Sequence, residues 1–205
     1  ISVSGESSLW KVELSHDTYK LARTVIYATG SHHRHLGIKE EEQFIGKGVS
    51  YCAVCDGAFF KDKSVIVAGG GNSALGDALY LSDICADVYI VHRRDEFRGD
   101  AVTLEKLRSC DNVHIVTGVT IQALKGEKKL EEVVLSDGSV IKANGLFVAI
   151  GMEPETDILK GVVKLDNTGY VVAGEDCVTS AKGLFVAGDV RTKELRQVIT
   201  AAADG

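Results

Sequence analysis

A glycine-rich loop between two apolar runs constrains the fold of this chain more than any other feature. Ser64–Ala68 is short, β-branched and fully apolar, as in strands that are buried on both faces. Gly69-x-Gly71-x-x-Ala74 follows, then apolar residues at helical spacing, then a second apolar run at Asp87–Val91. Strand, helix and strand in this order form a βαβ unit. The sequence therefore predicts an α/β fold with a parallel sheet.

The glycine loop itself predicts a dinucleotide site. The first glycine allows a tight turn, the second lets the backbone approach a pyrophosphate, and Ala74 lets the helix pack closely on the strand. The phosphates would lie at the helix N-terminus, where we expect Asn72 and Ser73 to contact them. The short pattern is weak evidence alone, but its place between a strand and a helix makes it specific.

Basic residues at the end of the second strand indicate whether the site prefers NADPH or an NAD nucleotide without the 2′-phosphate. That strand ends in His92, Arg93 and Arg94, with Arg98 one helical turn beyond. Guanidinium groups bind a 2′-phosphate, whereas an NAD site usually carries a carboxylate here. The alternative is a solvated basic turn that forms local ion pairs with the acidic residues beside it. The position of these arginines at the end of the second strand of the βαβ unit favours the 2′-phosphate site, and therefore NADPH.

A Cys-x-x-Cys pair precedes the nucleotide unit. Cys52 and Cys55 can close a reactive disulfide, and the adjoining Asp56 could move a proton as thiol and thiolate interconvert. Three alternatives remain open: a zinc site, a static structural disulfide and two inert core thiols. A zinc site would need two more ligands, and the remaining cysteines are isolated in sequence.

Composition narrows the class of protein. The 205 residues carry a net charge of −6, which argues weakly against a nucleic-acid partner. No apolar run approaches the roughly 20 residues that span a bilayer, so no membrane partner is expected. Five sparse cysteines are unlike a secreted disulfide framework. We expect a reducing, cytoplasmic compartment.

Several further elements are predicted outside the βαβ unit. Residues 31–48 read as irregular and end in a loose Gly46-Lys47-Gly48, and a helix is predicted around residues 104–107. Apolar strand-like runs followed by glycine recur, which suggests two related nucleotide domains. The predicted strands cover residues 10–14, 19–22, 24–28, 114–117, 132–135 and 146–150.

With these features in order, the sequence closely resembles the bacterial-type, low-molecular-weight thioredoxin reductases over essentially its whole length. No single motif is sufficient, but their order and separations are specific. The matching motifs are ATG (Ala28–Gly30), CAVCDG (Cys52–Gly57), GGGNSA (Gly69–Ala74), HRRDEFR (His92–Arg98), FVAIG (Phe147–Gly151), FVAGDV (Phe185–Val190) and RQV with an alanine-rich helix (Arg196–Ala203).

The resemblance implies two Rossmann-like, three-layer ββα domains, with an NADPH domain inserted into a split FAD domain. Residues 1–48 would end the first FAD segment, 49–150 would form the NADPH domain with the Cys-x-x-Cys pair, and 151–205 would give most of the second FAD segment. Gly46-Lys47-Gly48 and the region of Gly151 would be the two hinge strands of a domain rotation. The family's first FAD segment opens with its own glycine loop, which these residues lack, so we expect both ends of the FAD domain to be truncated and FAD to bind poorly to them alone.

The resemblance also assigns site residues. Cys55 would face the flavin, Cys52 would attack the disulfide of thioredoxin, and Asp56 would be the general acid and base. Ile150 is expected to border the nicotinamide nucleotide. Residues expected near FAD are Thr29, Gly30, Gly188, Asp189, Arg196, Gln197 and Val198.

The function implied is an NADPH-dependent thioredoxin-disulfide reductase, a flavoprotein and a homodimer when full length. One rival is the flavoprotein component of an alkyl-hydroperoxide reductase, which shares the cysteine pair but lacks the arginine run and favours NADH. A ferredoxin–NADP reductase of this fold lacks the cysteine pair. The isolated residues could also be a non-catalytic NADPH-binding module.

Overall fold

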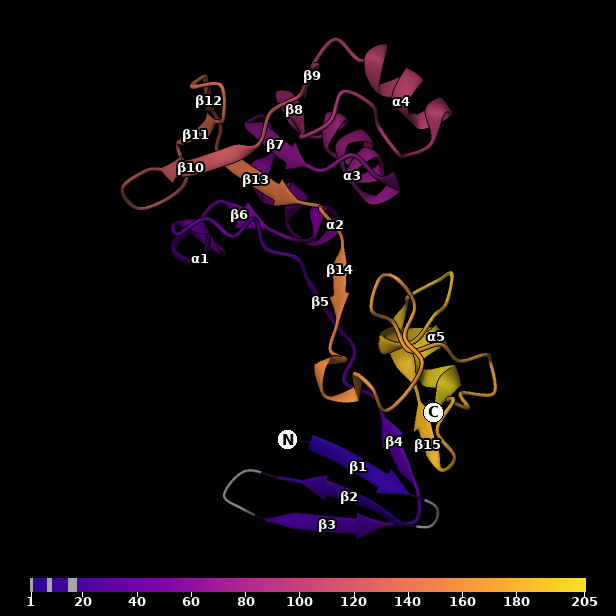
Figure 1. Ribbon diagram of the computed structural model, residues 1–205. Helices are drawn as coiled ribbons and strands as arrows, with labels where there is room; N and C mark the ends of the chain where they lie inside the picture. Colours follow the sequence, from indigo (N-terminus) through magenta and orange to yellow (C-terminus); the bar gives the residue numbers. More distant parts are fainter. Residues whose placement is uncertain (1, 7–8, 15–17) are drawn as a thin grey trace. The chain divides into compact units, whose positions relative to one another are not determined.

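The chain forms two compact units in a computed structural model that describes residues 2–6, 9–14 and 18–205. Residues 33–151 form one unit, here called the inserted unit, and residues 1–32 and 152–205 form the other, here called the flanking unit. One unit is therefore inserted in sequence between two separated segments of the other, as the predicted split arrangement requires. Both units are drawn in Figure 1.

A five-stranded parallel sheet organises the inserted unit. The predicted βαβ unit is confirmed, because β7 and β8 pair in parallel on either side of α3 in the sequence. The strand order is β6 (Val49–Ser50), β13 (Gly145–Val148), β7 (Ser64–Ala68), β8 (Asp87–His92) and β9 (Val113–Thr117). The main helices are α3 (Asn72–Ser82) and α4 (Ala101–Arg108), seen beside this sheet in Figure 1.

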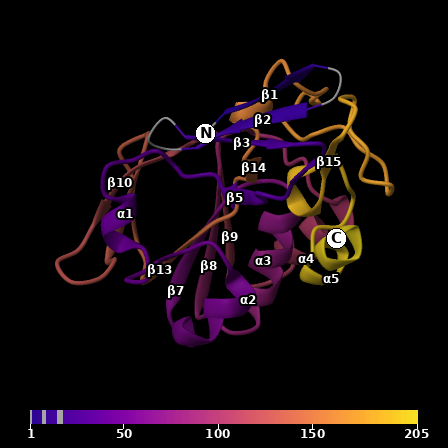
Figure 2. The same ribbon diagram turned by 90° about the horizontal axis from the view of Figure 1, so that it is seen from below.

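Each face of this sheet is buried by a different layer. Side chains alternate along a strand, so Val65 and Val67 pack in a cluster with α3, while Ile66 and Ala68 pack in a second cluster on the opposite face. The second cluster includes side chains of a small antiparallel sheet, visible around β10 in Figure 2. This sheet contains β10 (Ile121–Lys125), β11 (Glu132–Leu135) and β12 (Val140–Lys142). The expected three-layer ββα arrangement is therefore present.

The short helices of the inserted unit are α1 (Glu41–Phe44), α2 (Ala53–Asp56), which contains Cys55, and the 3₁₀ helix η1 (Gly57–Phe60) that follows it. Residues 31–48, read from the sequence as irregular, contain α1, because Phe44 anchors its short turn in the core.

The flanking unit combines an antiparallel meander with one parallel strand pair. The predicted strands at residues 10–14 and 19–22 are confirmed with small shifts of their bounds. The meander has the order β1 (Ser2–Glu6), β2 (Leu9–Glu13) and β3 (Tyr19–Ala22), and β4 (Val25–Tyr27) pairs in parallel with β15 (Leu184–Val186). Trp10, Tyr27 and Leu184 share its apolar core. The run at residues 24–28 is not buried throughout in this structure, since Ile26 is 71% exposed.

A buried ion-pair network anchors the end of the flanking unit. Asp204 closes α5 (Val198–Asp204) and receives hydrogen bonds from the Arg191 guanidinium at 2.7 and 2.8 Å. It also receives the Lys193 ammonium at 2.8 Å and the Gly188 backbone N–H at 2.7 Å. The network therefore ties α5 to η3 (Gly188–Val190). One further 3₁₀ helix, η2 (Asp157–Leu159), lies in this unit.

The chain passes between the units at a two-stranded ladder of β5 (Ser31–His33) and β14 (Met152–Pro154). The prediction of a crossing strand near Gly151 is therefore close. The prediction of the other at Gly46-Lys47-Gly48 is wrong, because Lys47 bonds to Phe44 and Gly48 lies against Leu130 within the inserted unit. For the same reason the inserted unit begins at His33 rather than at residue 49. Among the described residues, no helix is long and apolar enough to cross a membrane.

Candidate functional site

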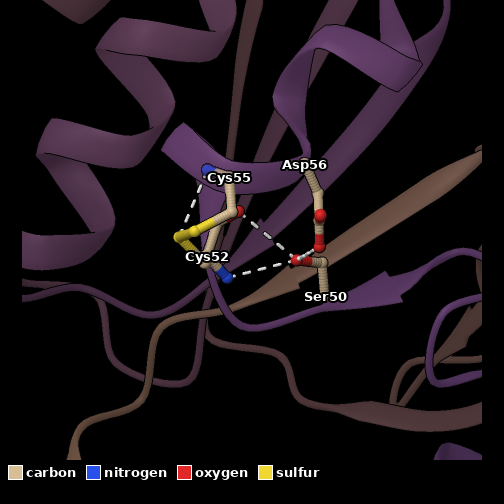
Figure 3. Close-up of a disulfide and its surroundings, with 4 residues drawn as sticks. All are labelled: Ser50, Cys52, Cys55 and Asp56. Atoms are coloured by element: carbon tan, nitrogen blue, oxygen red, sulfur yellow. Dashed lines mark hydrogen bonds between the residues drawn. A yellow bond between two sulfur atoms is a disulfide. The ribbon is translucent and has the colours of Figure 1, made fainter.

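The two cysteines of the Cys-x-x-Cys pair form a disulfide. The Cα atoms of Cys52 and Cys55 lie 5.3 Å apart, and Cys52 caps the N-terminus of α2, where its sulfur accepts the Cys55 N–H at 3.2 Å (Figure 3). Cys55 is exposed and Cys52 is half-buried. No group of three metal-ligating side chains exists among the described residues. The structure therefore places the pair as an accessible disulfide rather than as inert core thiols.

Ser50 connects the acidic residue to the first cysteine. Its hydroxyl donates to the Asp56 carboxylate at 2.6 Å and accepts the Cys52 backbone N–H at 3.1 Å. Figure 3 shows the Asp56 carboxylate aimed at Ser50. Ser50 was not among the predicted site residues, although its place two residues before the first cysteine was a possible signal. Together these contacts fix Asp56 beside the disulfide turn.

The glycine loop has the geometry that its spacing predicts. Gly69 has φ of +148°, and a Cβ there would overlap the carbonyl oxygen of Ala149 and crowd the Ala74 methyl group. Gly71 differs, because a Cβ on Gly71 would meet no protein atom within 4 Å. The first glycine is thus required by the fold, whereas the second leaves open space beside the N-terminus of α3. No side chain caps that N-terminus, so its backbone N–H groups can donate hydrogen bonds to a phosphate.

His92 lies beneath the glycine loop. Its ring packs against Gly70 and stacks on Phe97 at 5.1 Å between centroids. Burial lowers the pKa of His92, and the neighbouring Arg98 and Arg94 lower it further. The neutral ring has a buried Nε2 atom with no hydrogen-bond partner among the described residues. Such an atom is costly unless a ligand satisfies it.

A cavity of about 360 Å³ opens over the glycine loop, within the inserted unit. Arg93 and Arg98 line it, but Arg94 does not. Arg98 is held in place by its backbone N–H, which bonds to the Gly70 carbonyl at 2.8 Å. Its lining residues are Arg34, Leu36, Ala68, Gly69, Gly70, Gly71, Asn72, Ser73, Val91, His92, Arg93, Arg98, Val119, Thr120, Ile121, Ala149, Ile150 and Gly151. Arg34, Leu36 and the segment at 119–121 were not among the predicted site residues, because no sequence motif marks them.

Five of the expected FAD residues lie in the flanking unit around η3 and the start of α5: Gly188, Asp189, Arg196, Gln197 and Val198. Asp189 has a buried carboxylate oxygen, and Arg196 a buried Nε, that lack hydrogen-bond partners in the described part of the chain. The Arg196 guanidinium stacks on the Tyr170 ring at 3.9 Å. Gln197 caps α5, and Val198 is 87% exposed. Unpaired buried polar atoms and an exposed apolar side chain fit a bound polar cofactor.

Thr29 and Gly30 lie at the end of β4 and are engaged locally. The Thr29 hydroxyl donates to the Glu155 carbonyl at 3.0 Å, and the Gly30 carbonyl accepts the Glu155 N–H at 3.1 Å. Gly30 has φ of +74° and space around its Cα.

Comparisons with known proteins agree with this geometry. The family model described as pyridine nucleotide-disulphide oxidoreductase matches residues 6–205. The thioredoxin reductase of Mycoplasma genitalium is 44% identical over 198 residues, which cover 94% of this chain and 63% of that relative. The chain thus spans somewhat less than two thirds of this relative's length.

Solved structures give the same result. The thioredoxin reductase from Giardia duodenalis is similar with a TM-score of 0.80 and 35% identity, over 99% of this chain and 69% of that one. The thioredoxin reductase from Streptococcus pyogenes is similar with a TM-score of 0.79 and 36% identity, over 99% and 68%. With its glycine loop, its exposed disulfide and these likenesses, the chain belongs to the pyridine nucleotide-disulphide oxidoreductase family.

Proposed function

We propose that the chain is part of a thioredoxin-disulfide reductase, which passes electrons from NADPH through FAD and the Cys52–Cys55 disulfide to oxidised thioredoxin. The observation that carries the proposal is that the disulfide and the glycine loop both follow parallel strands of one sheet. The disulfide follows β6 and the glycine loop follows β7, and both strands run parallel to β13. The carboxyl ends of parallel strands share one edge of a sheet, where α/β proteins bind their ligands.

NADPH is the nucleotide that the cavity fits. The open space at Gly71 would take the pyrophosphate, and the unpaired Nε2 of His92 would gain a partner from the nucleotide. Arg93 and Arg98, at the end of β8, would hold the 2′-phosphate. NADPH, which carries this 2′-phosphate, is therefore favoured over NADH as the hydride donor.

FAD fits the flanking unit through its unpaired polar atoms. Asp189 would accept from the ribityl or pyrophosphate region, while Arg196, Gln197 and Val198 would line the ring system. When bound, FAD supplies the exchange of an electron pair between NADPH and a disulfide. The chain's residues named here would orient it, and the Cys52–Cys55 disulfide would accept the electrons.

The disulfide chemistry uses the cysteine pair and one acid. Two electrons and one proton break the Cys52–Cys55 bond and leave a thiol and a thiolate. The Cys52 thiolate attacks one sulfur of the partner's disulfide, and the departing partner thiolate takes a proton. Asp56, held by Ser50, is the group proposed to supply that proton. Cys55 then attacks the Cys52 sulfur and reforms the original bond, and the proton of its thiol passes to the second partner sulfur as that sulfur leaves, so that the partner is released as a dithiol.

The proposal includes a reducing, cytoplasmic compartment and a homodimer. The isolated thiols of Cys85, Cys110 and Cys177 suit a reducing environment. Burial raises the pKa of the Cys85 thiol to about 11, which keeps it protonated and inert. The dimer rests on the family resemblance, and the mass of the full-length protein in solution tests it.

An anaerobic titration with NADPH tests the electron path. The full-length protein should show flavin absorption that bleaches with NADPH and recovers when oxidised thioredoxin is added. In Cys52→Ser the flavin should still bleach with NADPH but should not recover with thioredoxin. A flavin that NADPH cannot bleach, or that recovers with thioredoxin in the Cys52→Ser variant, would contradict the proposal.

A further inference from the structure

Arg34 lines the nucleotide cavity although it belongs to no recognised motif. Its side chain passes over Gly151, since a Cβ on that glycine would lie 4.0 Å from the Arg34 Cδ. The side chain is exposed, and no described residue forms an ion pair with its guanidinium. An arginine without a protein partner on the wall of a phosphate-binding cavity is available to a ligand.

The backbone around Arg34 is held so that this side chain faces the cavity. The Arg34 N–H donates to the Gly151 carbonyl at 3.0 Å. On the other side of the segment, the rings of His33 and His35 each lie 5.3 Å from the Tyr51 ring. Alternate residues of an extended segment point to opposite sides. The two histidines therefore face Tyr51, while Arg34 faces the cavity.

A buried carboxylate locks this arrangement. Glu41 is 2% exposed and accepts the backbone N–H groups of Leu36 and Gly37 at 3.0 and 3.1 Å. It also accepts the Tyr51 hydroxyl at 2.8 Å. Burial, and then this hydrogen bond, raise the pKa of Tyr51, so its hydroxyl remains a donor at neutral pH. The position of Arg34 is thus set before any ligand binds, which lowers the entropy that binding costs.

The strand order indicates which half of the nucleotide reaches Arg34. In the order β6-β13-β7-β8-β9, the glycine loop follows β7, and Arg93 and Arg98 lie after β8 on one side of it. Gly151 follows β13, which lies on the other side of β7, and the Arg34 side chain lies against Gly151. A dinucleotide bound with its adenosine at β8 and its pyrophosphate at the loop must extend its other half toward β13.

We propose that Arg34 is a positioning residue for the nicotinamide half of NADPH and binds the phosphate and ribose of that half. The inference rests on the proposed use of NADPH. It adds a third cationic contact, from outside the βαβ unit, to the two arginines expected at the 2′-phosphate. Since Arg34 directly follows β5 and bonds to the residue preceding β14, this contact also brings the nucleotide to the crossing segments.

Binding of two nucleotides to the full-length protein separates this role from a general loss of structure. Arg34→Ala should raise the dissociation constant for NADPH roughly tenfold, as expected for a lost charge-assisted hydrogen bond. It should leave the constant for 2′,5′-ADP, which lacks the nicotinamide half, within about twofold of wild type. Arg34→Lys should recover part of the NADPH affinity. Isothermal titration calorimetry measures both ligands.

Arg108→Ala is the matched control, because Arg108 is an exposed arginine of the same unit that, among the described residues, pairs with Glu105 alone on the surface of α4. Its affinities should equal those of wild type. Unchanged NADPH affinity in Arg34→Ala would overturn the inference, and so would an equal loss for NADPH and 2′,5′-ADP. A wild-type protein that binds neither ligand would overturn the proposed function itself, and this inference with it.

Discussion

The two units build their candidate sites from different materials. In the inserted unit, backbone geometry makes the site: a glycine at positive φ, an uncapped helix N-terminus and a cavity at the edge of one sheet. In the flanking unit, charged side chains make the site. Asp189 and Arg196 have buried polar atoms without hydrogen-bond partners among the described residues, and the ion pair of Asp204 and Arg191 holds the surrounding turns. The first site should therefore respond most to added atoms, and the second to removed charge.

The largest effect is expected for Gly69→Ala in the inserted unit. The added methyl group would overlap the Ala149 carbonyl, and φ of +148° is unfavourable for alanine. Strain and overpacking together should cost about 3 to 5 kcal/mol of stability. Chemical denaturation and NADPH titration of the full-length protein should both show large losses.

Gly71→Ala is the matched variant, because its Cβ meets only open space. It should keep the stability of the wild type and still lose NADPH affinity, since the methyl group would occupy the space proposed for the pyrophosphate. Full NADPH affinity in Gly71→Ala would break the assignment of the loop. Full stability in Gly69→Ala would break the distinction between the two glycines.

Asp204→Asn is the corresponding test of the flanking unit. Hydrogen bonds from Arg191 hold the pKa of the Asp204 carboxyl well below its usual range. Replacing one partner of a buried ion pair costs about 3 kcal/mol at pH 7. A depressed pKa gives stability that is present above the unfolded value of about 4 and is lost as the pH falls below it. The difference in the free energy of unfolding between wild type and Asp204→Asn should therefore become smaller in acid.

Glu175→Gln is the control for that network, because the Glu175 side chain is 88% exposed although it also contacts Arg191. Its effect on stability should stay below about 1 kcal/mol. A loss as large as that of Asp204→Asn, or a gap that is constant from pH 3 to pH 7, would mean that charge does not hold this unit together.

Removing two arginines should have the next largest effect. Arg93→Ala with Arg98→Ala should weaken NADPH binding by roughly 30-fold to 100-fold and NADH binding only slightly, as expected for losing two charge-assisted contacts to the 2′-phosphate. Arg94→Ala should leave NADPH binding nearly unchanged, because Arg94 does not line the cavity. Equal losses for NADPH and NADH would contradict the phosphate assignment.

The sequence predicted best what short-range patterns control. Ser64–Ala68 is a strand with the predicted bounds, and Gly69 has the conformation that its place in the loop requires. What failed depended on contacts between distant residues. Ser31–His33 is too polar to read as a strand and forms one only because β14 pairs with it. Arg34 reaches the cavity because Glu41 and Tyr51 hold its neighbours, and no local pattern records that arrangement.

The smallest effect is expected for Asp77→Asn, and it should depend on pH in the opposite sense to that of Asp204→Asn. Asp77 lies half-buried on α3 in the inserted unit, and burial raises its pKa to about 6. A carboxyl with a raised pKa favours folding while it is protonated and costs stability as the pH rises through about 6. Asp77→Asn should therefore stabilise the protein by about 1 kcal/mol at pH 8 and by almost nothing at pH 4. Denaturation at both pH values measures this, and an equal effect at each would mean that Asp77 is ionised at little cost. With the Asp204 result, the expected outcome means that the flanking unit loses stability as the pH falls below about 4, whereas the inserted unit loses stability as the pH rises through about 6. The Asp204 carboxylate is stabilised by its pairing with Arg191, while partial burial favours the neutral form of Asp77.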